Sequence, residues 1–233
     1  MINITKRKEA PQSLAKEKAK ANGSYREEDV VLALYEDSHN KCYLCEDTLL
    51  TTINVEHFHE HGGDKDLKFD WNNLHYACGH CNYTKNDTFK KRDSNLLNCA
   101  NPECLVDYWI IYRLEEDDKL VAHAVINQNP MADVSMYQKE TDNTILLLDR
   151  IYNGTGTAIR NREAANLLTR VQLEIINFKE NLLSYLSASD GLSKQDYKTK
   201  LGKAIADSSP FAAFKRWILR DNGLASEFNL SPE

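Results

Sequence analysis

The amino-acid sequence predicts an α+β protein in which a short, turn-rich segment precedes a mainly helical C-terminal region. Two C-x-x-C pairs, "CYLC" at 42–45 and "CGHC" at 78–81, bracket the run "TINVEHF" at 52–58, which is typical of a strand. After residue 140, apolar residues recur mostly three or four positions apart, the period of an amphipathic helix. A chain of 233 residues with 42% hydrophobic content is long enough to bury a core.

A helix is expected over about residues 25–38, in "SYREEDVVLALYEDSHN". Its apolar residues between Val30 and Tyr35 follow helical spacing, and Ser24 stands three residues before Glu27 as in a capping box. The residues before this helix contain a proline, a lysine-rich run and a glycine. They are expected to form either a docking arm or a solvated tail.

The rest of the chain predicts a hairpin followed by helices. "YWIIYRL" and "LVAHAVI" flank the acidic turn "EEDD", as the strands of a β-hairpin do. "TILLLDRIYNG" and the run from "TAIRN" to "LLSYL" predict helical structure, the second a long amphipathic helix. Two shorter helices are expected to begin at Ser193 and at Ser209-Pro210, the last one ending at Gly223.

These features divide the chain into four parts. They are an N-terminal arm and helix (1–40), a cysteine-rich module (41–92), a β-hairpin and connecting region (93–140), and a helical C-terminal region (141–233). The longest apolar runs are far shorter than the roughly 18 to 20 residues that span a bilayer, so no membrane-spanning helix is expected. The first 20 residues are basic and polar, unlike a secretory signal or an anchor, which predicts a cytoplasmic protein.

The net charge of the chain limits the ways in which it can bind nucleic acid. A formal charge of −6 argues against a broad surface that coats nucleic acid. A small, local basic site remains compatible with this charge.

The two C-x-x-C pairs predict a zinc site with four thiolate ligands, Cys42, Cys45, Cys78 and Cys81. The 32 residues between the pairs exceed the spacing of a simple zinc ribbon, so a substantial structure is expected between them. Four thiolates complete a tetrahedral zinc, which makes the metal structural and leaves the nearby histidines available for other work. The alternative is four reduced cysteines in a hydrophobic core.

A further pair, Cys99 and Cys104, lies in "LLNCANPEC". Four residues separate its members, and no histidine pair accompanies them. Buried or free thiols are expected there, with a second metal site as the alternative.

Between the zinc ligands, the sequence places Glu56-His57 at the end of the expected strand, then a glycine pair and "WNNL" at 71–74, and Asn82 directly after the last cysteine. This order, over about residues 41–86, resembles the HNH nucleases of the zinc-knuckle type. The resemblance implies a ββα-metal (HNH) nuclease module, in which a short hairpin and a helix hold one divalent cation. The four-cysteine zinc site would hold that module together, and the helical C-terminal region would extend it.

The resemblance also implies a role for each matching residue. His57 would be the general base, Glu56 the acidic metal ligand, and Asn82 the second metal ligand, while Asn73 would hold the loop between them. A neutral imidazole can take a proton from water near neutral pH, and a hard cation on oxygen ligands compensates the charge at phosphate. Because the family often has histidine where Asn82 stands, Mg²⁺ or Mn²⁺ is favoured over zinc as the catalytic cation.

Basic residues that follow the second cysteine pair are expected to contact nucleic acid. In "NYTKNDTFKKR" they are Lys85, Lys90, Lys91 and Arg92. Such a cluster suits a phosphate backbone, although a solvated charged face is the alternative for residues 90–92. Lys85 also matches a lysine that is frequent at this place in HNH nucleases. His59 and His61 are expected in a loop, where they contact phosphate at most.

Outside the module, "APQSL", the "SY" that enters the first helix and "YNGTG" in the helical half resemble the HNH subunit of Septu-type antiphage systems and of related retron-associated nucleases. That resemblance implies an ATPase partner and an activity that is restrained until infection. The N-terminal arm and the helical region would then be docking surfaces. The alternative is a helical cap that buries the nuclease core.

Three functions are compatible with these features of the sequence. The leading hypothesis is a metal-dependent endonuclease that hydrolyses phosphodiester bonds of DNA. The alternatives are a non-catalytic zinc-binding module that recognises nucleic acid or protein, and an HNH nuclease that cuts RNA. The presence of Glu56-His57 favours an enzyme over a binding module.

Overall fold

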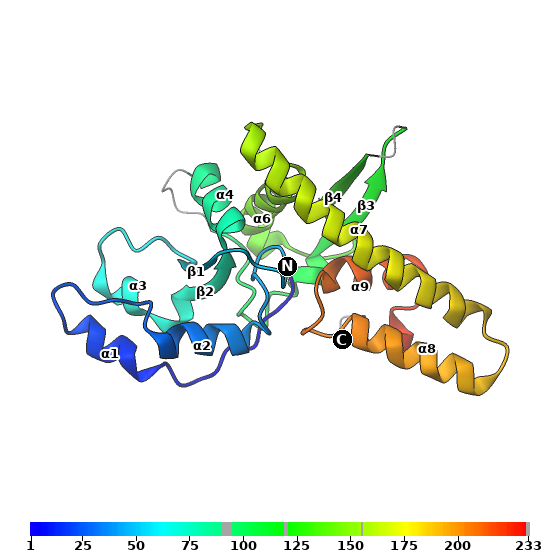
Figure 1. Cartoon of the computed structure of the whole chain (residues 1–233), viewed down its shortest axis with the longest axis horizontal. Coiled ribbons are helices and arrows are strands. Elements are labelled where there is room, and N and C mark those ends of the chain that lie inside the picture. Colours follow the sequence, from blue (N-terminus) through cyan, green and yellow to red (C-terminus); the bar gives the residue numbers. More distant parts are fainter. Residues whose placement is uncertain (90–94, 119–120, 155, 232–233) are drawn as a thin grey trace.

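A computed structural model describes residues 1–89, 95–118, 121–154 and 156–231. The α+β class is confirmed: within these ranges helices dominate, and the strands form two separate two-stranded antiparallel sheets. The N-terminal helices lie beside the first sheet at one end of the molecule, and the longest helix runs past the second sheet towards the opposite end (Figure 1).

The N-terminal residues fold against the rest of the chain. Helix α1 (Gln12–Lys18) buries Leu14 in a hydrophobic cluster with α2 (Glu28–Asp37) and the first sheet. Helix α2 confirms the predicted helix, but the predicted capping box is wrong, because the N-cap residue is Glu27. The Ser24 hydroxyl instead accepts a hydrogen bond from the Arg26 amide at 3.1 Å, which forms a local turn before the helix begins.

The first sheet lies between the two cysteine pairs. Strand β1 (Ile53–His57) confirms the predicted strand and pairs antiparallel with β2 (Leu74–Cys78), so that Glu56 lies opposite His75. Their connection contains α3 (Lys65–Phe69) and the short 3-10 helix η1 (Trp71–Asn73), and α4 (Gly79–Phe89) follows β2 directly. The local order is therefore strand, strand, helix.

Glycine is required at the start of α4. A Cβ atom on Gly79 would lie 2.3 Å from the Thr52 hydroxyl oxygen, and the Gly79 amide donates to that oxygen at 3.1 Å. The glycine of "CGHC" thus lets the second cysteine pair approach the residue that precedes β1.

The second sheet confirms the predicted hairpin. Helix α5 (Val106–Trp109) leads into β3 (Ile110–Glu116), which pairs with β4 (Ala122–Gln128). The 3-10 helix η2 (Ser135–Tyr137) then enters the helical region.

The helical C-terminal region contains α6 (Gln138–Asn153), α7 (Ala158–Ser187), α8 (Gly191–Ala204), α9 (Ala212–Asp221) and the short η3 (Ser226–Phe228). The long amphipathic helix is confirmed as α7. Helix α8 begins before Ser193, because the Asp190 side chain caps it by accepting from the Ser193 amide at 2.8 Å. Helix α9 begins after Phe211, whose φ is 51°, so Pro210 lies outside it, and the chain turns at Gly223 as expected.

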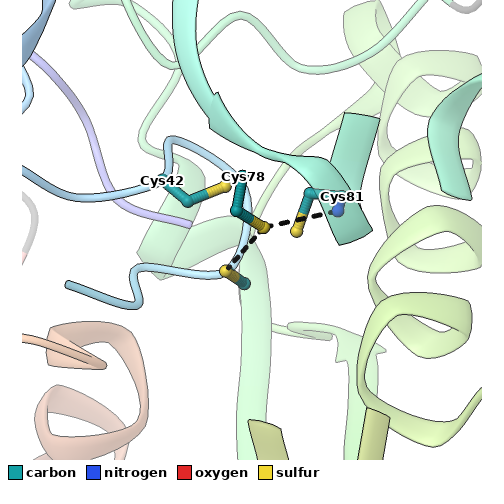
Figure 2. Close-up of side chains that lie close together, drawn as sticks. Cys42, Cys78 and Cys81 are labelled. Atoms are coloured by element: carbon teal, nitrogen blue, oxygen red, sulfur yellow. Dashed lines mark hydrogen bonds between the residues drawn. The ribbon is translucent and has the colours of Figure 1, made fainter. Parts of the chain in front are cut away.

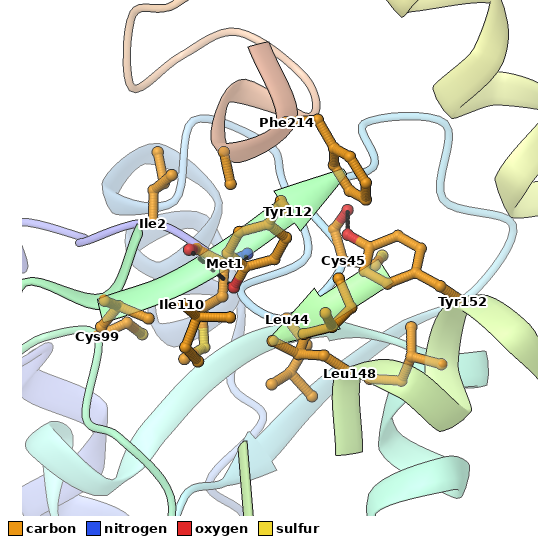
Figure 3. Close-up of a cluster of buried hydrophobic side chains, with 14 of the residues drawn as sticks. Met1, Ile2, Leu44, Cys45, Cys99, Ile110, Tyr112, Leu148, Tyr152 and Phe214 are labelled. Atoms are coloured by element: carbon orange, nitrogen blue, oxygen red, sulfur yellow. Dashed lines mark hydrogen bonds between the residues drawn. The ribbon is translucent and has the colours of Figure 1, made fainter. Parts of the chain in front are cut away.

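The largest hydrophobic cluster joins parts of the chain that are distant in sequence. It contains the first two residues, the first cysteine pair, the β3–β4 hairpin, α6, half of α7, and α9 (Figure 3). Within it the Tyr152 hydroxyl of α6 donates to the Cys45 carbonyl oxygen at 3.0 Å. A separate cluster lies among α7, α8 and α9. The cysteine-rich segment and the helical region therefore share one core.

No helix in the described ranges is both long and apolar enough to cross a membrane.

Candidate functional site

The four predicted zinc ligands come together as a buried cluster. Cys42 and Cys45 lie in the turn before β1, Cys78 ends β2, and Cys81 lies in the first turn of α4. Their sulfur atoms all lie within 4.8 Å of one another, and those of Cys45 and Cys78 are 4.0 Å apart. Figure 2 shows the converging side chains and the amide of Cys81, which donates to the Cys78 sulfur.

This cluster has the donor set and the dimensions of a tetrahedral zinc site. With Zn–S bonds of about 2.3 Å, sulfurs in such a site lie roughly 3.8 Å apart, close to the separations observed. Burial raises the pKa of the Cys45 and Cys81 thiols, and a bound zinc ion would reverse that effect because its ligands are thiolates. The four residues can therefore hold a structural metal such as zinc.

Backbone hydrogen bonds shape the first cysteine turn. The Cys42 amide donates to the Asp47 carbonyl oxygen at 3.0 Å, and the Glu46 amide donates to the Cys42 carbonyl oxygen at 2.9 Å. Glu46 adopts the left-handed φ of 59° that closes this turn. The Tyr43 amide donates to the Tyr76 carbonyl oxygen at 3.0 Å, which fastens the turn to β2 and brings the two pairs together.

Cys99 and Cys104 are buried free thiols, as expected. Burial raises the pKa of Cys99 to about 12. Among the described residues, one group of three or more potential ligands is close enough to hold a metal, and it consists of Cys42, Cys45, Cys78 and Cys81.

The predicted catalytic residues Glu56, His57 and Asn82 line one cavity of about 200 Å³ between β1, α4 and the residues before α2. A larger cavity of about 380 Å³ lies beside the cysteine cluster, between α4 and α7, and contains none of the predicted catalytic residues. The smaller cavity is the candidate active site, because it contains His57.

His57 is held as a neutral imidazole with a defined tautomer. Its Nε2 atom lies 3.1 Å from the Lys68 carbonyl oxygen. A carbonyl can only accept, so the neutral ring carries its proton on Nε2 and its lone pair on Nδ1. Burial lowers the pKa of His57 to about 4, against the opposing effect of the hydrogen bond to Lys68. At neutral pH, Nδ1 can therefore take a proton.

Glu56 lies in a buried ion pair. Tyr43 donates its hydroxyl to Oε2 at 2.7 Å, and the Lys85 ammonium donates to Oε1. Lys85 also donates to the carbonyl oxygens of His57 at 2.7 Å and Phe58 at 2.8 Å. Burial raises the pKa of Glu56, and the adjacent ammonium acts in the opposite direction. With 5% of its surface exposed and three acceptors bound, Lys85 would have to leave this pocket to contact phosphate, so that role stays a prediction.

The same ion pair bears on the expected Mg²⁺ or Mn²⁺ site. Glu56 and Asn82 both line the cavity, but the Lys85 ammonium sits at one Glu56 oxygen. The Asn82 side-chain oxygen accepts from Asn86 at 3.3 Å. As arranged, these residues do not form a ready divalent-cation site, because a cation on Glu56 would compete with Lys85.

Asn73 ties the two ends of the loop between the strands. Its amide group donates to the carbonyl oxygens of His59 at 2.9 Å and Leu67 at 3.0 Å, and its side-chain oxygen accepts from the His59 amide at 2.7 Å. Asn73 is buried, so these bonds satisfy polar atoms that water does not reach. The contacts are those expected of an asparagine that holds this loop.

The remaining predicted nucleic-acid contacts are not all located. His59 is exposed on the loop after β1, outside the residues that line the cavity. Lys90, Lys91 and Arg92 lie outside the described residues.

The cavity also contains side chains to which the sequence assigned no catalytic role. The centre of the His61 ring lies 4.7 Å from that of His57, and the centre of the Tyr25 ring lies 4.5 Å from it. Arg26 and Glu60 complete this rim. The short spacing between His57 and His61 could have indicated that His61 belongs to the cavity. Tyr25 and Arg26 reach the cavity through tertiary packing, which no local sequence pattern reveals.

No protein-family model matches this chain, and the search of curated proteins gives no match to it either.

Proposed function

We propose that this chain is a metal-dependent HNH endonuclease that hydrolyses phosphodiester bonds of DNA, with His57 as the general base. The observation that carries the proposal is the 3.1 Å contact between His57 Nε2 and the Lys68 carbonyl oxygen inside a cavity. That contact leaves Nδ1 as the basic nitrogen of a neutral imidazole, which is the form needed to deprotonate water. The strand, strand, helix order around the cavity and the adjacent zinc-type cluster support it.

We assign structural zinc to Cys42, Cys45, Cys78 and Cys81, and the catalytic Mg²⁺ or Mn²⁺ to Glu56 and Asn82. The second assignment requires the Lys85 ammonium to yield its place at Glu56 when a cation binds. An oxygen ligand set of carboxylate and amide suits a hard cation of this kind. Asn73 would then hold the loop that connects β1 to β2, and His57 would abstract the proton from the attacking water.

The Glu56–Lys85 pair also favours the alternative function. A carboxylate that is neutralised by a buried ammonium can be purely structural, and the chain would then be a non-catalytic zinc-binding module for nucleic acid or protein. An HNH nuclease that cuts RNA is the other alternative, because His57 and a cation recognise phosphate rather than the sugar.

We also propose an antiphage role for this chain, with an ATPase as its protein partner. Helix α7 exposes Leu173, Ile176 and Leu183, whose exposed fractions lie between 53% and 64%. Exposed apolar side chains of this kind on one helix suit a protein partner. Co-purification with an ATPase encoded beside this chain, lost on Leu183→Glu, would support that partnership.

The test of the proposed enzyme is cleavage of supercoiled plasmid by purified protein. The protein keeps its zinc and is freed of other divalent cations before the assay. Cleavage is then measured with Mg²⁺, with Mn²⁺ and with neither. A structured RNA of similar length serves as the alternative substrate. We expect cleavage of DNA only when a divalent cation is present. Intact DNA under every condition, with DNA binding retained, would favour the binding module, and cleavage of RNA alone would favour the RNA nuclease.

A further inference from the structure

We propose that Arg26, presented by the loop between α1 and α2, binds a backbone phosphate of the nucleic acid at the His57 cavity. This inference rests on the proposed function and adds a substrate-binding residue from outside the strand, strand, helix unit. It is carried by the way the loop is fixed, by the position of Arg26 at the rim of the cavity, and by the charges around it.

The loop that carries Arg26 is fixed to α3 and α1. The Lys68 ammonium donates to the Gly23 carbonyl oxygen at 3.0 Å, and the Lys65 ammonium donates to the Lys20 carbonyl oxygen at 3.0 Å. Gly23 is buried, and a Cβ atom there would lie 1.8 Å from the Glu17 carbonyl oxygen, so only glycine allows this close approach. The loop therefore has a defined place beside the cavity.

Tyr25 and Arg26 bring this loop to the catalytic histidine. The Tyr25 ring contacts the His57 ring edge-on, with 4.5 Å between the centroids. The Arg26 guanidinium lies 5.1 Å from the centre of the Tyr25 ring, and it donates to the Tyr25 hydroxyl at 3.1 Å. Arg26 lines the same cavity as His57. A phosphate bound to this guanidinium would lie next to the imidazole that activates water.

Arg26 is the cation lining the cavity that forms no ion pair among the described residues. The other cation that lines the cavity, Lys85, donates to Glu56 and to two carbonyl oxygens. Arg26 is exposed, and no carboxylate among the described residues, including the neighbouring Glu60, lies within ion-pair distance of it. Its planar guanidinium can donate two parallel hydrogen bonds to a phosphate.

The charge of the surrounding segment agrees with this role. Residues 1–26 contain seven lysines and arginines and two glutamates, a net charge of +5 in a chain whose formal charge is −6. This excess of positive charge in the segment that ends at Arg26 would attract a polyanion.

The experiment measures binding of a short, fluorescently labelled DNA duplex by anisotropy over a series of salt concentrations. His57→Ala serves as the parent, so that the duplex is not cut. We expect Arg26→Ala in this parent to weaken binding roughly tenfold, as loss of a charged hydrogen bond does, and to lower the slope of log affinity against log salt by about 1. Arg26→Lys, which keeps the charge, should retain the slope.

Arg162→Ala is the matched control, because Arg162 is an exposed arginine on α7 that does not line the cavity. It should leave both affinity and slope unchanged. An unchanged slope for Arg26→Ala, or an equal loss for Arg162→Ala, would overturn the role of Arg26. Plasmid cleavage by the unmutated protein reports the proposed function separately, and a lack of both cleavage and salt-dependent binding would contradict that function itself.

Discussion

The carbonyl oxygen of Lys68, at the end of α3, lies 3.1 Å from Nε2 of His57 at the end of β1. This contact fixes the tautomer of the neutral histidine, so that the lone pair lies on Nδ1. Asn73 stabilises the loop that connects the two residues.

Cleavage should depend little on pH in the range where free histidine titrates. Burial lowers the pKa of His57 to about 4, and the unprotonated ring is the active form. The rate should therefore stay nearly constant from pH 8 down to about 5 and fall only as pH approaches 4. Rates on labelled DNA across this range check the prediction. An acid limb with a midpoint near 6.5 would show that His57 titrates as an ordinary histidine.

Loss of one predicted zinc ligand should remove the metal and destabilise the fold. Cys78→Ser takes away one of four thiolates, so zinc content measured by mass spectrometry should fall from about one ion per chain to near zero. The free energy of unfolding should fall by roughly 3 kcal/mol or more. Cys104 is a buried thiol outside the cluster, so the Cys104→Ser protein should retain its full zinc content. A full zinc content in Cys78→Ser would mean that the four thiols are not the ligands.

Removal of the Lys85 ammonium should cost stability because it leaves Glu56 buried without a cation. We expect Lys85→Met to lower the free energy of unfolding by about 3 to 5 kcal/mol in urea titrations. Adding Glu56→Gln should recover part of this loss, since the two side chains interact directly. A stability change below about 1 kcal/mol, together with weaker DNA binding, would instead agree with the phosphate contact that the sequence alone predicts for Lys85.

Asn73 should contribute far more to the stability of the fold than the neighbouring Asn72. Asn73→Ala removes three hydrogen bonds from a buried position, which should lower the free energy of unfolding by about 2 to 4 kcal/mol. Asn72→Ala changes an exposed side chain in the same turn and should have an effect within about 0.5 kcal/mol. Equal effects of the two substitutions would show that Asn73 does not hold the loop.

Features with a local signal were predictable from the sequence. The C-x-x-C spacing identified the cysteine cluster, the two strand-like runs that flank "EEDD" identified the β3–β4 hairpin, and apolar periodicity identified α7. The short helices α1 and α3 were not predicted. Packing of Leu14 supports the first, and an Asp64 cap that accepts from the Asp66 and Leu67 amides supports the second.

The composition of the cavity depended on contacts that the sequence does not encode locally. Lys85 lies in a helix of mainly polar residues and was expected to contact phosphate, yet the packing of α4 against β1 buries it beside Glu56. Arg26 lines the His57 cavity because Gly23 lets its loop lie against Glu17 and α3. Pairings of this kind follow from tertiary structure, so residue spacing could not reveal them.

The measurement that tests the central claim most directly compares plasmid cleavage by the unmutated protein, His57→Ala and His123→Ala under identical conditions. His123 lies on β4, is 47% exposed at its side chain and is remote in sequence from the cavity, so it controls for the loss of a histidine as such. We predict cleavage by the unmutated protein and by His123→Ala, and a loss of at least about 100-fold in His57→Ala, as expected for removal of a general base. Undiminished cleavage by a folded His57→Ala protein would contradict the account.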